Sequence, residues 1–212
     1  MEKYKKEKYW SKYACGYDEG VEYIVGKEIQ HTIVAKLSEE RDIGEVIEFG
    51  CGTGYFTKVI AKNARHVIAT DLSDEMLEVA RAQLKELQNI TIAKADCEST
   101  SFPSERFDTV VMVNVVHFIE NPYKSLQESY RILKDGGVLL LVDYTGYGMK
   151  GFEKMKLGIR FLRKCGKPPR YAQPNLSPDK FSALVESTGF KVKEVQLIGG
   201  NIKALYLLGR KL

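Results

Sequence analysis

Residues Val46–Tyr55 read VIEFGCGTGY, and this stretch decides the fold. Its apolar start predicts a buried parallel strand, because strands covered by helices on both faces are almost continuously apolar. Glu48 stands near the end of that strand, and glycines follow at alternate positions, namely Gly50, Gly52 and Gly54. Such glycines let the backbone turn with positive φ and let a ligand lie against bare main chain. We therefore expect a ligand-binding turn at the carboxyl end of this strand, where open α/β sheets bind their ligands.

A second predicted strand ends in a carboxylate. The apolar run 66–70 is followed directly by Asp71. A carboxylate at a strand end can accept hydrogen bonds from both hydroxyls of a ribose. Between the two strands, Tyr55, Phe56, Val59 and Ile60 recur at helical spacing, so the glycine turn is expected to open a helix. The spacing E-x-G-x-G-x-G differs from the G-x-G-x-x-G that is typical of dinucleotide sites.

The stretch Glu48–Gly54 resembles the first motif of the class I S-adenosylmethionine (SAM)-dependent methyltransferases, in particular the small-molecule branch that includes the ubiquinone and menaquinone methylases. In that family the glycine loop holds the amino acid and sugar portions of the cofactor. The resemblance implies SAM as cofactor and S-adenosylhomocysteine as product. The cofactor-binding positions that it implies in this part of the chain are Glu48, Gly50, Cys51, Gly52, Gly54, Asp71, Leu72 and Asn114.

The N-terminal segment, residues 1–37, is expected to form a helical cap in two amphipathic pieces. Many small-molecule methyltransferases begin with a W-x-x-x-A-x-x-Y-D segment, which the chain matches at Trp10, Ala14, Tyr17 and Asp18. In that family the segment closes over the cofactor, which would place Tyr9, Tyr13 or Tyr17 against the sulfonium. The alternative interpretation is a solvated helix whose aromatic side chains dock on the domain.

The predicted strand 89–95 ends at Asp96 and Cys97. In the resembling family an acidic residue here accepts a hydrogen bond from the adenine amino group, and the next backbone amide meets a ring nitrogen. The resemblance implies these cofactor-binding roles for Asp96 and for the backbone of Cys97. The alternative interpretation of Asp96 is a loop carboxylate that caps a turn at residues 98–101.

Two candidate bases follow later strands. The clearest strand, residues 107–114, should open beside the glycine loop, and His117 comes just after it. Tyr144 comes directly after the next predicted strand, 138–143. An alcohol, phenol or protonated amine acceptor needs a base, which His117 or Tyr144 could supply by position, whereas a thiolate or an activated carbon needs none. A histidine near an apolar helix start is also commonly a packing group.

Capping and turn signals complete the predicted topology. Helices are expected to begin after Ser73, after Asn121 and after Ser177, and the second of these should end with Gly136 at its C-cap. Strands 190–198 and 202–209 are joined by a glycine-rich turn that predicts a β-hairpin. The fold class is therefore α/β: a doubly wound, seven-stranded, mostly parallel sheet with a C-terminal antiparallel hairpin, the Rossmann-like fold that the resemblance implies.

Length and composition favour one domain. The chain has 212 residues, 44% apolar and 28% charged, which suits a single methyltransferase domain, 1–212. Its expected parts are the cap at 1–37, a SAM-binding core at 38–144, a basic lid insertion at 145–176, and a last helix and hairpin at 177–212. The first ten residues lack an apolar leader segment and no apolar run approaches a membrane span, so a cytoplasmic protein is expected. The four cysteines are far apart, so we expect reduced thiols and no metal site.

The segment 145–176, called the basic segment below, carries eight lysines and arginines against a single acidic residue, Glu153. In the resembling family insertions at this point form substrate lids. Its cations could attract an acidic substrate, a membrane surface or RNA, or could simply be a solvated face. The formal net charge of +4 is too small to indicate strong nucleic-acid binding by itself, and DNA is not expected as a partner.

The leading hypothesis is an enzyme that transfers the SAM methyl group by in-line displacement to a small-molecule acceptor, because little chain is left over for docking a macromolecule. One alternative is a methyltransferase that acts on RNA or protein through the basic segment. Another is a noncatalytic SAM-binding module, or an NAD enzyme of similar topology. The sequence leaves the acceptor open, and it is compatible with a monomer or a homodimer.

Overall fold

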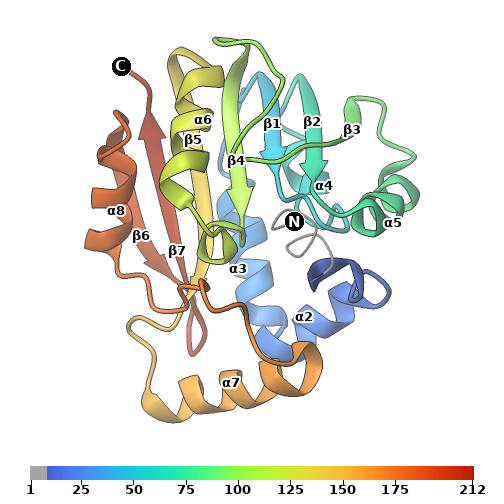
Figure 1. The fold of residues 1–212 in the computed structure, drawn as a ribbon, viewed down its shortest axis with the longest axis vertical. Helices are drawn as coiled ribbons and strands as arrows, with labels where there is room; N and C mark the ends of the chain where they lie inside the picture. The colour runs from blue at the N-terminus through green and yellow to red at the C-terminus, as the bar shows by residue number, and fades with distance from the viewer. Residues whose placement is uncertain (1–8) are drawn as a thin grey trace.

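The computed structural model describes residues 9–212 and contains a seven-stranded sheet in the order β3-β2-β1-β4-β5-β7-β6 (Figure 1). Neighbouring strands from β3 to β5 are parallel, and β7 is antiparallel to both β5 and β6. The predicted fold class is thus confirmed, including the C-terminal hairpin. The strands are β1 Glu45–Phe49, β2 His66–Asp71, β3 Ile90–Lys94, β4 Phe107–Val113, β5 Leu133–Thr145, β6 Lys191–Ile198 and β7 Lys203–Arg210.

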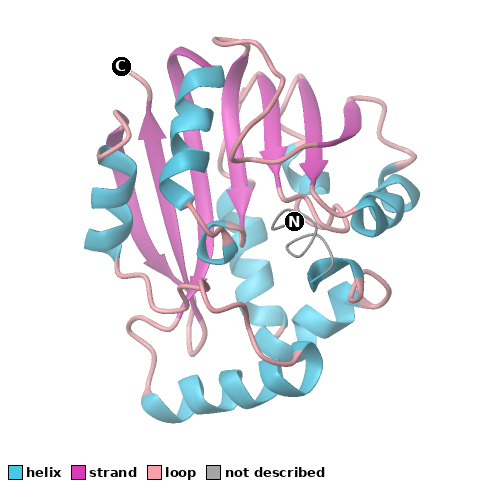
Figure 2. Cartoon of the chain, viewed as in Figure 1, coloured by secondary structure: helices cyan, strands magenta, loops and turns pink. Residues whose placement is uncertain are grey.

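Helices cover both faces of this sheet (Figure 2). Side chains of α3, α4 and α5 pack in the hydrophobic cluster on one face, and those of α6 and α8 pack in the cluster on the other. This is the layering that a mostly parallel sheet requires. The helices are α2 Tyr17–Val25, α3 Lys27–Leu37, α4 Thr57–Ile60, α5 Asp74–Leu84, α6 Pro122–Ile132, α7 Gly151–Cys165 and α8 Pro178–Glu186, with a short 3-10 turn η1 at Val116–Phe118.

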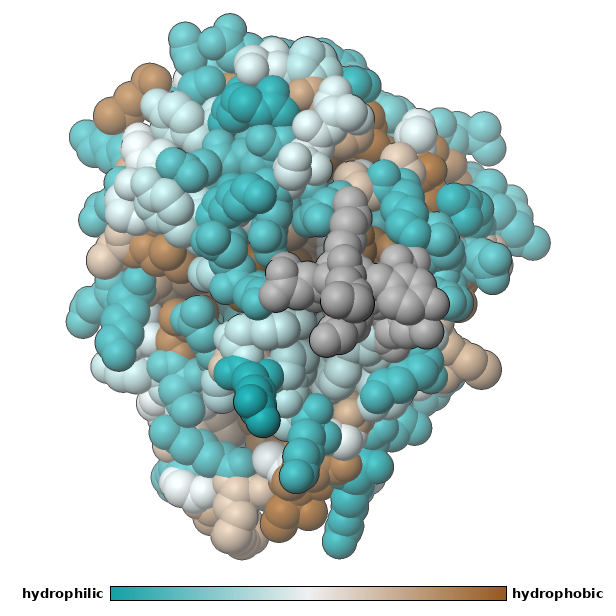
Figure 3. Space-filling view, in the orientation of Figure 1, coloured by the Kyte–Doolittle hydropathy of each residue, from teal (hydrophilic) through white to brown (hydrophobic). Residues whose placement is uncertain are grey.

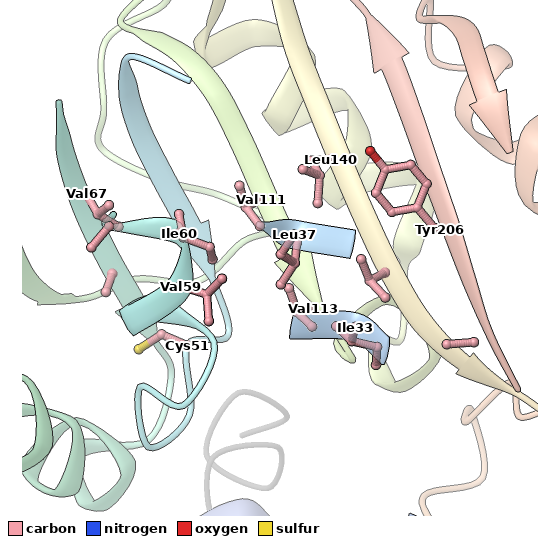
Figure 4. Packing of buried hydrophobic residues seen from close by; sticks show 14 of the residues in the cluster. Ile33, Leu37, Cys51, Val59, Ile60, Val67, Val111, Val113, Leu140 and Tyr206 are labelled. Atoms are coloured by element: carbon pink, nitrogen blue, oxygen red, sulfur yellow. The ribbon is translucent and has the colours of Figure 1, made fainter. Parts of the chain in front are cut away.

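The strand β1 shows why the apolar run at 46–49 is buried on both sides. Its side chains alternate, so Val46 packs in the α3 cluster while Ile47 and Phe49 pack in the α6 cluster. Figure 4 shows the first cluster, in which Ile33 and Leu37 of α3 reach the sheet. Within the N-terminal segment, α3 thus covers one face of the sheet.

Local capping signals are confirmed at three helix starts. The side chains of Ser73, Asn121 and Ser177 each accept a hydrogen bond from a backbone N–H in the first turn of the following helix. Each cap satisfies one of the amide groups that have no partner within the helix. These short-range contacts are the reason that the sequence predicts the helix starts well.

The expected end of α6 is wrong. The helix ends at Ile132, and Leu133 already has an extended backbone, is fully buried and pairs with Phe107 of β4. Gly136, with φ 72°, therefore lies within β5, where the pairing with β4 shifts register, instead of at a helix C-cap. Burial of Leu133 in the sheet overrides the local glycine signal. The first helix after the glycine turn is also shorter than expected, since α4 begins only at Thr57.

The carboxyl ends of β1, β2 and β4 point toward α2 and α7, which lie beyond that edge of the sheet (Figure 1). The helices α2 and α7 contact each other there. This edge is where doubly wound sheets bind ligands, because the loops diverge at the point where strand order reverses. Within residues 9–212, none of the helices has the length and apolar character needed to cross a membrane.

Candidate functional site

A cavity of about 840 Å³ opens at the carboxyl ends of the parallel strands. Its volume lies within the range of about 300–1,000 Å³ that is usual for small-molecule and cofactor sites. The strands contribute residues that follow β1, β2, β3, β4 and β5, while α2 and α7 supply further walls. Twelve of the fourteen residues that we predicted for the site line this cavity: Tyr17, Glu48, Gly50, Cys51, Gly52, Asp71, Leu72, Asp96, Cys97, Asn114, His117 and Tyr144.

The three glycines of the turn have different surroundings and therefore different structural roles. All have positive φ, which other residues rarely adopt. A Cβ on Gly52 would meet only the ring of Tyr17, at 3.9 Å, so bare backbone faces the cavity there. A Cβ on Gly50 would lie 2.4 Å from Val115, and one on Gly54 would lie 2.7 Å from Leu84. Gly54 is absent from the cavity lining, and its structural requirement is close packing against α5.

Asp71 is held in place at the end of β2. Its Oδ2 accepts a hydrogen bond from the Gly52 N–H at 2.9 Å, and its Oδ1 accepts one from the Ser73 N–H at 2.9 Å. Burial raises the pKa of Asp71, and these backbone hydrogen bonds oppose the rise. Each carboxylate oxygen keeps a second acceptor site, so the group can still accept from two hydroxyls of a ligand.

Glu48 is a buried carboxyl at the end of β1, with 1% of its surface exposed. Its Oε2 accepts a hydrogen bond from the Thr57 hydroxyl at 2.6 Å. Burial raises the pKa of Glu48 to about 7, despite the opposing hydrogen bond from Thr57. The side chain therefore changes charge near neutral pH, directly beside the cavity that it lines.

Asp96 follows β3, and its position is compatible with both interpretations from the sequence, a turn-capping carboxylate and a cofactor-binding one. Its Oδ1 accepts a hydrogen bond from the Glu98 N–H at 3.1 Å, as expected for a carboxylate that caps a turn. The same residue, together with Cys97, lines the cavity. A turn that fixes the carboxylate also presents it to a ligand, so the two roles are compatible.

Aromatic rings from the N-terminal segment form one wall of the cavity. Tyr17 and Trp10 line it, with ring centroids 6.2 Å apart, and Trp10 packs edge-on against Phe118 at 4.7 Å. Burial, followed by the nearby charge of Asp71, raises the pKa of Tyr17, so its hydroxyl keeps its proton. Faces of such rings attract cations, which suits a sulfonium centre.

Tyr9 does not line the cavity. Its hydroxyl donates to the Cys165 carbonyl at 3.4 Å, and Tyr13 donates to the same carbonyl. These contacts join the N-terminal segment to the end of α7. The prediction that Tyr9 binds the cofactor therefore stays a prediction without support from its position, and Tyr17 is the tyrosine of this segment that reaches the cavity.

The loop after β4 meets the end of β5 at Asn114. Its backbone has φ 60°, a conformation that a non-glycine residue seldom adopts, and its Oδ1 accepts from the Tyr144 N–H at 3.2 Å. Strained backbone of this kind is often kept at functional sites. The contact ties the loop that leads to His117 to the strand that carries Tyr144, beside the cavity.

His117 pairs with Asp143, a residue that we did not predict. The imidazole Nδ1 hydrogen-bonds Oδ1 of Asp143, and both residues are buried. Within residues 9–212, the Asp143 Oδ2 and the Tyr144 hydroxyl are buried without a partner that meets hydrogen-bond geometry. Burial raises the pKa of Tyr144 far above its usual range, with a smaller opposing effect of Asn114, so the phenol stays protonated. A histidine held by a carboxylate is the better candidate base.

Asp18 and Gln30 line the cavity but were not among the site residues that we predicted. Asp18 of α2 accepts from the Thr53 hydroxyl at 2.5 Å and from the Gln83 amide at 2.9 Å, and so connects the helical cap to the glycine turn and to α5. Gln30 is buried and lines the cavity from α3. The sequence signal for Asp143 was the one that identified Asp71, a carboxylate that ends an apolar parallel strand. Gln30 has no comparable signal, because a single polar residue within an amphipathic helix does not by itself indicate a ligand site.

Comparisons with known proteins support a methyltransferase. Residues 47–141 match the model of a methyltransferase domain. The chain is 34% identical over 101 residues to a demethylmenaquinone methyltransferase from Tropheryma whipplei, an alignment that covers 48% of this chain and 42% of that protein. It is 31% identical over 195 residues to an uncharacterised protein from Methanocaldococcus jannaschii, covering 91% of this chain and 84% of that one. The chain thus spans less than half the length of the curated quinone methyltransferase that it matches.

A solved structure shares nearly the whole fold. A SAM-dependent methyltransferase from Thermotoga maritima, described as a possible histamine N-methyltransferase, superposes with a TM-score of 0.75 at 21% identity. The superposition covers 96% of this chain and 99% of that one. At this identity the likeness concerns the fold, and it includes the edge of the sheet where the cavity lies.

Proposed function

Because the chain belongs to the class I SAM-dependent methyltransferases, we propose that it transfers the methyl group of SAM to a small-molecule acceptor bound in the cavity. The observation that carries the proposal is the meeting, in one cavity, of a held strand-end carboxylate, bare glycine backbone, an aromatic wall and His117, which hydrogen-bonds the buried Asp143. Separately each feature is common. Together they suit a nucleoside cofactor with a sulfonium and an acceptor that must lose a proton.

The donor groups of the cavity fit this cofactor. Asp71 would accept from the ribose hydroxyls, since its carboxylate is fixed by two backbone N–H groups and keeps free acceptor sites. Gly52 would let the ligand lie against the main chain, because nothing but the Tyr17 ring lies within 4 Å of the position of a Cβ. Asp96 would accept from the adenine amino group, and Tyr17 would face the sulfonium. When bound, SAM supplies an electrophilic methyl group on a good leaving group.

His117 is proposed to take the acceptor's proton. Its Nδ1 faces the Asp143 carboxylate, which favours the tautomer with the proton on Nδ1 and leaves a lone pair on Nε2. Asp143 would also stabilise the imidazolium that forms when Nε2 accepts the proton, as carboxylates do for other catalytic histidines. An alcohol, phenol or amine acceptor matches this arrangement, because each has a proton to lose.

The walls of the cavity would exclude water and orient the acceptor. Leu157 and Phe161 of α7 line it opposite the strand ends, and Phe161 stacks with Phe118 at a centroid distance of 6.1 Å. An apolar enclosure of this kind strengthens electrostatic interactions and limits hydrolysis. Alignment of acceptor and methyl group is the larger contribution that such a site can make.

The test is label transfer from methyl-labelled SAM. The purified protein is incubated with labelled SAM and a cell extract, and small molecules, RNA and protein are separated before counting. We expect label in the small-molecule fraction and its loss in Asp71→Ala, with binding of S-adenosylhomocysteine but not of NADH. Label in RNA or protein, or tight NADH binding, would contradict the proposal. His117→Asn is the variant that separates base catalysis from cofactor binding, because S-adenosylhomocysteine affinity should be unchanged.

A further inference from the structure

The helix α7 has an inner apolar face that packs on the protein and an outer apolar face that is largely exposed. Its inner face carries Leu157, Phe161 and Cys165 at helical spacing, and these side chains line the cavity and pack against the core. Its outer face carries a second apolar row that is exposed to solvent, and Leu162 at one edge of this row also borders the cavity. We call this row the α7 stripe, and it consists of Phe152, Met155, Ile159 and Leu162.

The α7 stripe is the main exposed apolar feature of the described residues. Four of the eight large apolar side chains that are exposed there belong to it, with exposed fractions of 66%, 56%, 43% and 52% along the helix. Their spacing i, i+3, i+7 and i+10 places them on one line along the helix. Figure 3 shows apolar side chains at the lower edge of the molecule, where α7 runs in Figure 1. A contiguous exposed patch of this kind usually marks an interaction surface.

Cations border the stripe. Lys156 and Arg163 follow Phe152 and Ile159 by four residues, which places each of them beside the apolar row. Both are exposed and make no ion pair with the described residues. The one acidic residue of the helix, Glu153, lies about 100° around the helix from Phe152 and is partly buried. The charge beside the stripe is therefore uniformly positive.

This pattern discriminates between possible occupants. A second copy docked stripe to stripe about a two-fold axis would bring the same cations together, and the outer face offers no carboxylate to pair with them. Three of the four stripe residues are aliphatic and give bases little to stack on, which disfavours single-stranded RNA. A membrane surface with anionic lipids accounts for both the apolar row and the cations beside it. The apolar row would enter the acyl chains, and the lysine and arginine would meet the anionic headgroups.

We propose that the outer face of α7 seats on a membrane surface that contains anionic lipids. The helix then lies in the interface, with the α7 stripe in the acyl region and Lys156 and Arg163 among the headgroups. Tyr147, which precedes the helix and is 45% exposed, is of the residue type that favours the headgroup level. The inner face of the same helix continues to cover the cavity, so docking requires no rearrangement of the fold.

The test is flotation of the whole protein with vesicles of phosphatidylcholine, with and without phosphatidylglycerol. We expect binding that is at least about tenfold stronger with phosphatidylglycerol and that weakens as salt is raised. The double variants Phe152→Ser/Ile159→Ser and Lys156→Glu/Arg163→Glu should each lose about tenfold or more of this binding. Tyr123→Ser and Lys85→Glu/Lys124→Glu, exposed positions on α6 and next to α5, are the matched controls and should bind like the parent.

Equal binding to both vesicle types, no binding to either, or undiminished binding by the α7 variants with a parental melting temperature would overturn the inference. A dimer seen in light scattering would also overturn the inference if only the Phe152→Ser/Ile159→Ser change disrupted it, because the stripe would then be a contact between two copies of the protein. Preferential RNA retention by the same surface would overturn it as well. Vesicle binding needs neither SAM nor an acceptor, so this result is independent of the proposed methyl transfer.

Discussion

Replacing Glu48 by glutamine should remove a pH dependence from the stability of the protein. The folded-state pKa of Glu48 is about 7 against an ordinary value of 4.5, because burial disfavours the charged form. Since the folded pKa is the higher one, the unfolded chain releases the proton first as pH rises. The contribution of protonated Glu48 to the free energy of unfolding is fully present below pH 4.5, falls between pH 4.5 and 7, and is lost above pH 7. At about 1.4 kcal/mol per unit, the total loss is about 3 kcal/mol.

The assay is urea unfolding of the parent protein and of Glu48→Gln without cofactor, at intervals from pH 4.5 to 8. The difference in unfolding free energy between the two proteins should move by about 3 kcal/mol in favour of the variant as pH rises. The amide can still accept the hydrogen bond from Thr57, so the variant should fold. Glu186→Gln, at an exposed position of α8, is the matched control and should follow the parent at every pH. A constant difference between parent and variant would refute the reasoning that burial without charge compensation sets this pKa.

The remaining predictions concern the cavity. Asp71→Asn should weaken binding of S-adenosylhomocysteine by about 10- to 100-fold in calorimetry, because hydrogen bonds to a charged acceptor are each worth about 1.5–3 kcal/mol; unchanged affinity would contradict the ribose role. Gly54→Ala should destabilise the protein by about 1–3 kcal/mol in chemical unfolding, since its φ is 86° and a Cβ would press on Leu84. Tyr144→Phe should leave stability within about 1 kcal/mol of the parent or raise it, because no group among the described residues meets hydrogen-bond geometry with this buried hydroxyl. It should also leave methyl transfer intact, whereas a large loss of turnover would return Tyr144 to the list of candidate bases.

Much of the fold was predictable because its signals are local. Apolar strands and capped helices can be recognised from a few neighbouring residues. The cap at Ser73, for example, joins residues only three apart. The prediction failed at Leu133, where the local signal of Gly136 competed with burial in the sheet. Tertiary packing overrides local helix and turn propensity because it involves more free energy than a single turn.

The candidate site was predictable to the extent that topology alone brings residues together. Gly52, Asp71 and Asp96 follow three parallel strands, and the carboxyl ends of such strands share one edge of the sheet. Tyr9 shows the limit of this reasoning. It is adjacent in sequence to a cavity residue, Trp10, yet its side chain turns to the Cys165 carbonyl.

By itself, then, the sequence determined the α/β topology, the glycine turn and the strand-end carboxylates, because hydrophobic period and glycine or capping positions report the conformation of a short segment directly. Only the tertiary structure decided what each side chain meets. It paired His117 with Asp143 across two strands, gave Gly54 a packing role against Leu84, and left the α7 stripe facing solvent. Periodicity defines the faces of an element, but the partner of each face depends on contacts between residues far apart in the chain.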